Sequence, residues 1–334
     1  MHSEKKYLRY YFSELQLRKL RIEPIAGDAS TRKYYRVFSS EQTWILCIDP
    51  DFSTFPSNDY PFLEVQQLLC HNSVPVPRII ASSKSESSML IEDCGNIRLQ
   101  DSILKDPSFA LTIYRESIDC MIRLQSIRGQ KDTLPFNRSF DQDKLMFEFD
   151  FFMTHTLKNR APCIHASETI STLQNEFSKI SKTLFRQKHF VLNHRDYHSK
   201  NILVFRNKPV IIDFQDARMG LPQYDAVSLL KDSYVTLDQE FVCEMQRYHY
   251  DRLAERKMME MSYDEYLYLF DMMAFQRNIK ALGTFFHQVN ERKNSSFEQY
   301  ISPTLAYLPA YIERQKELKT AGKIILNLLE PLNQ

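Results

Sequence analysis

The sequence predicts an α+β protein of two lobes, a small mixed lobe with an antiparallel sheet and a larger, mostly helical lobe. Two observations support this fold class. Short apolar, partly β-branched runs bounded by turn residues occupy the first third of the chain, which is typical of strands. From about residue 100 onward, apolar residues recur at i, i+3, i+4 and i+7, which is typical of packed helices. We therefore expect the small lobe at residues 1–95 and the large lobe at residues 96–334.

The small lobe should begin with a helical segment, because apolar residues recur at helical spacing over residues 5–20. Three strands, a helix and two further strands are expected after it. Two of the three strands before the helix have bounded segments, a turn and strand at 25–40 and a strand at 43–49. The helix is expected at 59–72 and the two further strands at 74–81 and 88–93. The lobe should end at Glu92 to Asn96, where the last strand meets a glycine.

In the large lobe we expect long helices interrupted once by two short strands. The helical periods cover residues 101–127, 141–157 and 167–187, and helices resume at residue 226. Between them, residues 201–205 and 209–213 form two apolar runs joined by three polar residues. A cleft between two such lobes is a common place for a ligand.

The composition excludes several classes of protein. The net charge is +1 and no block of Lys or Arg stands out, which argues against nucleic-acid or anionic-membrane partners. The N-terminus lacks an apolar signal core, and no run approaches the roughly 20 apolar residues of a membrane helix. The 6 cysteines include no C-x-x-C pair, which argues against a zinc site and against a disulfide scaffold. Reduced thiols in a cytoplasmic protein are the simplest interpretation.

The chemistry of the chain should lie between Val191 and Ala217, where acids and amides interrupt the apolar runs. Polar groups are costly to bury without partners, so these residues suggest a ligand. Phosphoryl transfer from ATP fits them, because it needs metal ions at the phosphates and a group that orients the attacking hydroxyl. Asn201 and Asp213 could hold Mg²⁺, which prefers oxygen ligands, and Asp196 could accept the hydroxyl proton.

The spacing of these residues also matches a known loop. Residues 194–196 and Asn201 reproduce the H-R-D-x-x-x-x-N pattern of protein kinases, and residues 213–214 stand where D-F-G begins, with Gln215 in place of glycine. An Asp and an Asn five residues apart are common by chance, and a solvated loop is the alternative. The added histidine, strand pair and second acid favour the kinase interpretation.

Four residues near the motif could support the site. His194 should support the loop, whereas the isolated His198 could touch the site but is more often a packed or surface residue. Asp216 could be a third acid near the metal ions or the cap of the next helix. Asp225 could likewise cap a helix or brace the catalytic loop, and we favour the brace.

Residues 194–201 and 211–234 resemble the aminoglycoside phosphotransferase and choline kinase superfamily. Within it, the likeness is greatest to bacterial cell-wall sugar kinases, which phosphorylate the anomeric hydroxyl of N-acetylmuramate and N-acetylglucosamine. Residues 27–37 resemble the phosphate loop of this subgroup, and residues 275–285 and 307–314 resemble its C-terminal helices. The likeness extends from about residue 25 to residue 315.

The resemblance implies a protein-kinase-like fold that uses ATP and Mg²⁺. The adenine would pair with the backbone near Glu92 and Cys94, and the phosphates would lie under Gly27, Asp28 and Ser30. Turn amides in such a loop point at phosphate oxygens. An ordinary hairpin turn is the alternative for Gly27 and Asp28.

The sequence departs from the superfamily at the nucleotide clamp. The third strand carries Asp49 where a lysine is expected, and Phe62 lies nearer than any glutamate to the expected helix position. Losing one partner of an ion pair would leave a charge unpaired, whereas losing both need not. The candidate cations for the phosphates are Arg32, Lys33 and Arg36, and we favour Arg32.

Arg277 and Lys280 lie three residues apart and would share one helix face. Aimed at the cleft, they would suit an acidic acceptor such as the lactyl carboxylate of N-acetylmuramate. The alternative is a solvated helix face. Gly283 in the same helix should permit close helix packing.

Three functions remain open from the sequence. The first is a small-molecule kinase that acts on an amino sugar. The second is a kinase for an aminoglycoside or another amino alcohol, since residues 141–150 include four acids that could face a cationic acceptor. The third is a pseudokinase that serves as a binding or scaffold module. The missing third-strand lysine favours the third, but the intact Asp196, Asn201 and Asp213 argue against it.

Overall fold

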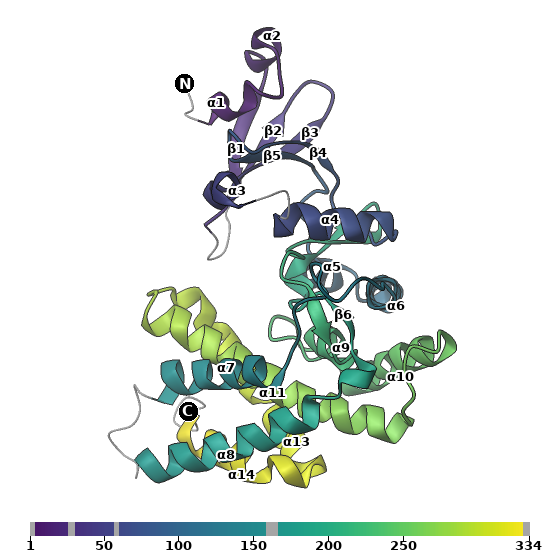
Figure 1. The fold of residues 1–334 in the computed structure, drawn as a ribbon, viewed down its shortest axis with the longest axis vertical. Coiled ribbons are helices and arrows are strands. Elements are labelled where there is room, and N and C mark those ends of the chain that lie inside the picture. The colour runs from purple at the N-terminus through teal and green to yellow at the C-terminus, as the bar shows by residue number, and fades with distance from the viewer. Residues whose placement is uncertain (1–3, 26–30, 57–59, 158–165, 330–334) are drawn as a thin grey trace.

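The computed structural model describes residues 4–25, 31–56, 60–157 and 166–329. It confirms the predicted α+β class: a small lobe built on an antiparallel sheet stands above a larger helical lobe along the long axis (Figure 1). The elements of the small lobe are α1 (Lys5–Leu8), α2 (Glu14–Leu17), β1 (Arg21–Ile25), β2 (Lys33–Phe38), β3 (Thr43–Ile48), α3 (Pro50–Thr54), α4 (Pro61–His71), β4 (Ile79–Ser83) and β5 (Ser88–Glu92).

The sheet of the small lobe has the order β1-β2-β3-β5-β4, with every neighbouring pair antiparallel. Successive strand residues point to opposite faces, so β3 contributes to two clusters. Leu46 and Ile48 pack with Leu8 and Leu17 under α1 and α2. Cys47 points the other way, into the main core that α4 shares with the large lobe. The sheet is therefore covered on both faces.

The large lobe contains helices around two short strand pairs. Its elements are α5 (Leu99–Lys105), α6 (Pro107–Gln125), α7 (Gln142–Phe152), the π-helical η1 (Met153–Leu157), α8 (Ala166–Leu184), η3 (Gln187–His189), β6 (Val191–Asn193), η4 (Ser199–Asn201), β7 (Ile202–Phe205), β8 (Lys208–Ile211), β9 (Arg218–Gly220), α9 (Gln223–Leu230), α10 (Gln239–Glu255), α11 (Tyr263–Asn290), η5 (Ser295–Tyr300), α12 (Ile301–Leu305), α13 (Leu308–Arg314), η6 (Lys316–Leu318) and α14 (Lys319–Leu329). β7 pairs with β8 as expected, and β6 pairs with β9.

Three expected helices are interrupted. The segment at residues 5–20 forms two short helices, because Ser13 and Gln16 make a capping box that starts α2 afresh. The helix expected at 101–127 divides at Asp106, which caps α6 ahead of a proline at its first position. The helix expected at 141–157 changes from α-helical to π-helical at Met153. Periodicity alone does not reveal these breaks, since the apolar faces continue through them.

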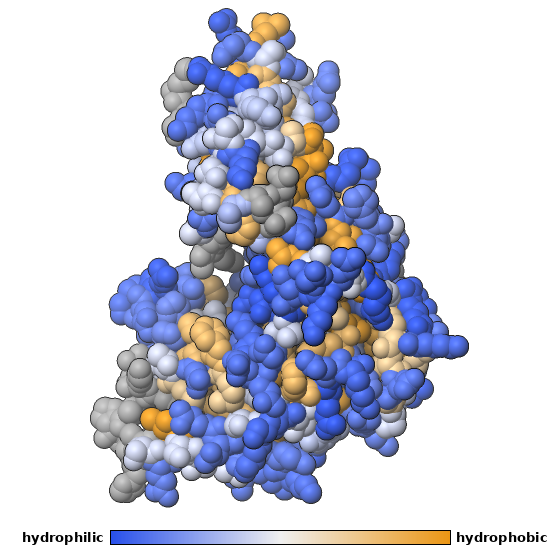
Figure 2. Space-filling view, viewed as in Figure 1, coloured by the Kyte–Doolittle hydropathy of each residue, from blue (hydrophilic) through white to orange (hydrophobic). Residues whose placement is uncertain are grey.

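The surface of the large lobe is mostly hydrophilic on the face that Figure 2 shows, and this face is indented between the lobes. Among the described residues, none of the helices has both the length and the apolar character needed to cross a bilayer.

α11 is the central helix of the large lobe. It is 28 residues long, and 16 of its residues are buried. It packs against α7, η1, α9 and η5. Gly283 makes the α7 contact possible, because a Cβ built there would lie 2.8 Å from the Cα of Phe152. The expectation of close packing at Gly283 is confirmed.

We expect Gly283→Ala to lower the free energy of unfolding by about 1–3 kcal/mol, because the added methyl group forces two backbones apart. The sign is informative, since Gly to Ala in an unconstrained helix interior stabilises by roughly 1 kcal/mol. Urea unfolding monitored by circular dichroism measures the change. Gln288→Ala in the same helix is the control and should change stability by less than about 0.5 kcal/mol. A stabilised Gly283→Ala variant would contradict the packing argument.

Candidate active site

The motif residues lie on a bend between β6 and β7, and on the exit of the β7–β8 hairpin. Two non-glycine residues adopt a left-handed backbone there: Arg195 has φ +85° and Asp213 has φ +66°. Such conformations cost of order 1–3 kcal/mol each and persist only where the surroundings hold them. The two positions are therefore held by specific contacts, which the structure shows.

Asp225, in α9, anchors the bend through two hydrogen bonds. Its carboxylate accepts hydrogen bonds from the backbone N–H groups of His194, at 2.6 Å, and Arg195, at 3.0 Å. The side chain is fully buried in the first turn of α9. Burial raises the pKa of its carboxyl to about 6, against the His194 ring and the two amides, which lower it. The brace that the sequence favoured is thus the arrangement that the structure has.

The ring of His194 ties the bend to the hairpin. The N–H of Asp196 donates to His194 Nδ1 at 3.3 Å, and His194 Nε2 lies 3.0 Å from the carbonyl oxygen of Ile212. With Nδ1 as acceptor, Nε2 carries the proton and donates to that carbonyl. One imidazole therefore fixes the bend relative to the residue that precedes Asp213.

Asn201 and Asp213 meet in front of the bend. Asn201 Nδ2 lies 3.3 Å from Asp213 Oδ2 and donates to the backbone oxygen of Asp196 at 3.0 Å. Asp213 is exposed, and its other oxygen accepts from Gln215 Nε2 at 3.0 Å. The amide oxygen of Asn201 and the carboxylate of Asp213 are the donor types that Mg²⁺ prefers. The hairpin thus brings together the two residues expected to hold metal.

Three cations surround the carboxylate of Asp196. Lys280 Nζ lies 2.8 Å from Oδ1, Arg195 Nε lies 3.9 Å from Oδ2, and Arg277 is close enough to contribute. Burial alone would raise the pKa of the Asp196 carboxyl, but these charges overcome it and hold the pKa well below its ordinary value. Asp196 is therefore ionised at neutral pH, with one oxygen bound to Lys280.

Arg277 supports the bend from α11. Its guanidinium donates to the carbonyl oxygen of Arg195 at 2.7 Å and lies over the ring of Tyr224, 4.3 Å from the centroid. The residue is only 8% exposed. Arg277 and Lys280 do share a face directed at the site, but they contact Arg195 and Asp196 of the bend itself.

The carboxylate of Asp216 lies close to three arginines. It accepts from Arg195 at 2.9 Å and lies 4.0 Å from both Arg138 and Arg218. It therefore binds the side chain of Arg195, whereas Asp225 binds the Arg195 backbone.

A cavity of about 290 Å³ opens beside Asp196. Sequence reasoning singled out part of its lining. The wall residues are Arg195, Asp196, His198, Ser228, Lys231, Asp232, Ser233, Tyr234, Arg277, Asn278, Lys280, Ala281, Thr284 and Phe285.

The wall residues that the sequence analysis did not assign to the site include His198 and the segment after α9, residues 231–234. Asp232 is buried and accepts from the N–H groups of Ser199 and Tyr234, each at 2.8 Å. Burial lowers the pKa of His198 to about 3, so this ring is neutral. The sequence signal was present, because residues 211–234 carry the family likeness, but nothing in their spacing points to a cavity.

On the nucleotide side, Arg32 pairs with Asp49. Arg32 Nε lies 2.6 Å from Asp49 Oδ2, which also accepts from the hydroxyl of Tyr60. The guanidinium lies 5.4 Å from the ring centroid of Phe62, and this ring contacts Phe214 beside the hairpin exit. Asp49 and Phe62 thus belong to one cluster, in which the acid directly follows β3 and the cation comes from the residue before β2.

Arg36 is engaged elsewhere. It bonds the carboxylate of Asp93 at 2.8 Å and the carbonyl of Gly95 at 3.0 Å, which ties the sheet to the segment that leaves it. Lys33 is exposed. Of the three candidate cations, Arg32 is the one in contact with the strand position where the family has its lysine.

The end of β5 and the segment that follows it contain the residues expected near the adenine. Glu92 accepts from the N–H of Arg78 at 3.2 Å, and Cys94 is buried beside Gly95, which has φ +80°. Gly27, Asp28 and Ser30 lie outside the described residues.

The comparisons with known proteins agree with this geometry. A profile of the phosphotransferase enzyme family, APH, matches residues 21–259. The chain belongs to this family. It is therefore a small-molecule kinase, an ATP-dependent phosphotransferase that acts on a hydroxyl group, as the sequence predicted.

Its relatives include bacterial sugar kinases. The chain is 26% identical to the N-acetylmuramate/N-acetylglucosamine kinase of Neisseria meningitidis over 319 residues, which covers 91% of this chain and 89% of the relative. It is 25% identical to the protein of the same name from Pseudomonas aeruginosa, with 91% and 88% covered.

Solved structures of other kinases and phosphotransferases share the fold. An ethanolamine kinase from Plasmodium vivax superposes with a TM-score of 0.66 at 14% identity, covering 93% of this chain and 89% of that one. An ADP-bound aminoglycoside phosphotransferase, APH(2'')-Ib, gives a TM-score of 0.60 at 13% identity, with 97% and 99% covered. The predicted protein-kinase-like architecture is confirmed.

We expect Asp225→Ala to lower the free energy of unfolding by about 1–3 kcal/mol for each buried amide that loses its acceptor. Chemical denaturation of the two proteins at pH 7 measures the loss. Asp132→Ala, at an exposed position, is the control and should stay within about 0.5 kcal/mol of the parent. Equal stability of the Asp225 variant and the control would show that the carboxylate does not hold the bend.

Proposed function

We propose that this kinase transfers the γ-phosphoryl group of ATP to the anomeric hydroxyl of N-acetylmuramate or N-acetylglucosamine. The observation that carries the proposal is the position of Asp196, an ionised carboxylate on the wall of a polar cavity and beside the Asn201–Asp213 pair. The names of relatives at 25% and 26% identity support the choice of acceptor.

In this proposal Asp196 orients the acceptor hydroxyl and accepts its proton. Its low pKa keeps it unprotonated, and Lys280 holds one of its oxygens so that the other faces the acceptor. Asn201 and Asp213 would hold Mg²⁺, which supplies positive charge to the phosphates. Asp225, His194 and the Arg195 backbone keep Asp196 in place and take no part in proton transfer.

The nucleotide would lie between the lobes. We assign residues 1–95 to nucleotide binding, with the adenine at the backbone of Glu92 to Cys94 and the phosphates under Gly27, Asp28 and Ser30. Arg32 supplies the cation that the third strand lacks, and Asp49 holds it in position. Residues 96–334 carry the catalytic loop and the acceptor cavity.

The charge of the cavity favours an amino sugar over an aminoglycoside. Arg195, Arg277 and Lys280 contribute cations to the wall, while the buried Asp232 is already bound to two amides. A polycationic acceptor would meet repulsion there. The four acids of residues 141–150 do not line this cavity, and of these Asp141 caps α7 and Glu148 is buried.

The proposal is tested by incubating the enzyme with ATP, Mg²⁺ and a panel of amino sugars, amino alcohols and aminoglycosides. We expect transfer to N-acetylmuramate or N-acetylglucosamine, and we expect Asp196→Asn to reduce kcat at least about 100-fold while ATP binding persists. Asp132→Asn should leave kcat unchanged. Transfer to aminoglycosides alone would overturn the acceptor, and ATP binding without turnover would favour a binding module.

A second prediction follows from the Lys280–Asp196 pair. In Lys280→Met, burial still raises the pKa of Asp196 while its strongest opposing charge is gone, so the carboxyl becomes protonated at higher pH. The acid limb of the kcat–pH profile should therefore move to higher pH. Lys179→Met removes a similar ion pair, 2.7 Å long, from the surface of α8 and should leave the profile unchanged. Superimposable profiles for all three proteins would refute this coupling.

A further inference from the structure

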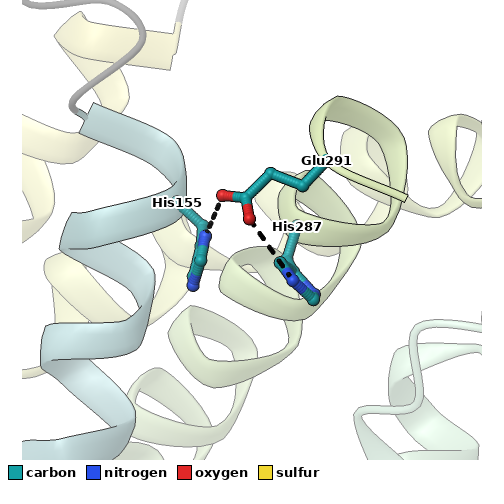
Figure 3. Close-up of side chains that lie close together, drawn as sticks. All are labelled: His155, His287 and Glu291. Atoms are coloured by element: carbon teal, nitrogen blue, oxygen red, sulfur yellow. Dashed lines mark hydrogen bonds and ion pairs between the residues drawn. The ribbon is translucent and has the colours of Figure 1, made fainter. Parts of the chain in front are cut away.

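Two histidines and a glutamate gather where η1 meets the end of α11 (Figure 3). His155 lies in η1, and His287 and Glu291 lie four residues apart at the end of α11. Glu291 lies between the two rings: one oxygen contacts His155 Nδ1, and the other lies 3.6 Å from His287 Nε2. Each residue offers one possible metal-ligand atom, and these three atoms all lie within 4.8 Å of one another.

The fold brings these side chains together for identifiable reasons. Residues four apart on a helix share a face, which places His287 beside Glu291. Gly283, one turn earlier, lets α11 approach the backbone of Phe152 closely. The π-helical turn then carries His155 toward α11. The ring of Phe151 packs on both imidazoles, with centroids 4.2 Å and 5.4 Å away.

We propose that His155, His287 and Glu291 form a binding site for a transition-metal cation, with Zn²⁺ as the best fit. Two imidazoles and one carboxylate are a ligand set that zinc accepts, with a water molecule completing four-coordination. The partly exposed cluster leaves room for that water, because the side chains are 16%, 21% and 49% exposed.

The distances suit this cation. Zn²⁺ binds nitrogen and oxygen at about 2.0–2.2 Å, so tetrahedral ligand atoms lie roughly 3.3 Å apart. The His287–Glu291 pair, at 3.6 Å, is already near this separation. The shorter His155–Glu291 contact is a hydrogen bond that the cation would replace. The His155 hydrogen bond, with smaller contributions from the neighbouring cations, keeps the pKa of Glu291 below its ordinary value, so the carboxylate is ionised.

The scattered cysteines argued against zinc, but this site uses none of them. Its ligands come from two elements that are distant in sequence, so no short sequence motif indicates the site. A bound cation would join η1 to the helix that carries Lys280 two turns earlier. The site is distinct from the Asn201–Asp213 pair, whose oxygen donors suit Mg²⁺.

The test is Zn²⁺ titration by calorimetry of untagged, metal-free protein in millimolar Mg²⁺, which occupies oxygen-ligand sites. We expect the parent protein to bind one Zn²⁺ and to gain thermal stability. His155→Ala and His287→Ala should each weaken binding at least about tenfold, because each removes one of three ligands. His71→Ala, an exposed histidine at the end of α4, is the matched control and should bind as the parent does.

Glu291→Gln is the second variant, since it preserves size and hydrogen bonding while removing the charge. It should keep the far-ultraviolet spectrum of the parent and still bind Zn²⁺ more weakly. Co²⁺ substitution should give visible absorption typical of a nitrogen and oxygen ligand set. Equal Zn²⁺ binding by the parent and the His155→Ala/His287→Ala double variant, or a thiolate charge-transfer band with Co²⁺, would overturn the proposal.

Discussion

The site depends on one buried carboxylate. Asp225 accepts hydrogen bonds from the first two backbone N–H groups of the bend after β6. Without this acceptor, these buried N–H groups would have no hydrogen-bond partner. The left-handed backbone at Arg195 is stabilised by this contact, together with the hydrogen bond that Arg277 donates to the Arg195 carbonyl. The bend in turn sets the direction of the Asp196 side chain. The strained bend is thus held by charged side chains that bind its backbone.

The contacts of Asp49 show how a buried acid is stabilised beside the sheet of the small lobe. Asp49 directly follows β3, and an unpaired acid at 1% exposure would be strongly unfavourable. Arg32 and Tyr60 both bind this acid, so its charge is neutralised by one guanidinium and one hydroxyl group. The helix position expected to hold a glutamate is then free for Phe62, whose ring contacts Phe214.

α11 links most features of the large lobe. Within three turns it supplies Arg277 to the bend, Lys280 to Asp196 and Gly283 to the packing against α7. Its last turn supplies the histidine and glutamate that face η1. Because one rigid helix carries all of these contacts, the spacing between the bend, the cavity and the cluster at η1 is fixed by helix geometry.

The sequence alone determined the lobes, the strand pair and the convergence of Asn201 with Asp213, because those relations span few residues and follow from strand and hairpin geometry. It also identified Asp225 as the brace. Only the tertiary structure decided that Lys280 binds Asp196, that Asp49 pairs with Arg32, and that residues 231–234 line a cavity. These contacts join elements whose relative placement depends on the packing of whole helices and sheets. The spacing of residues along the sequence does not indicate this placement.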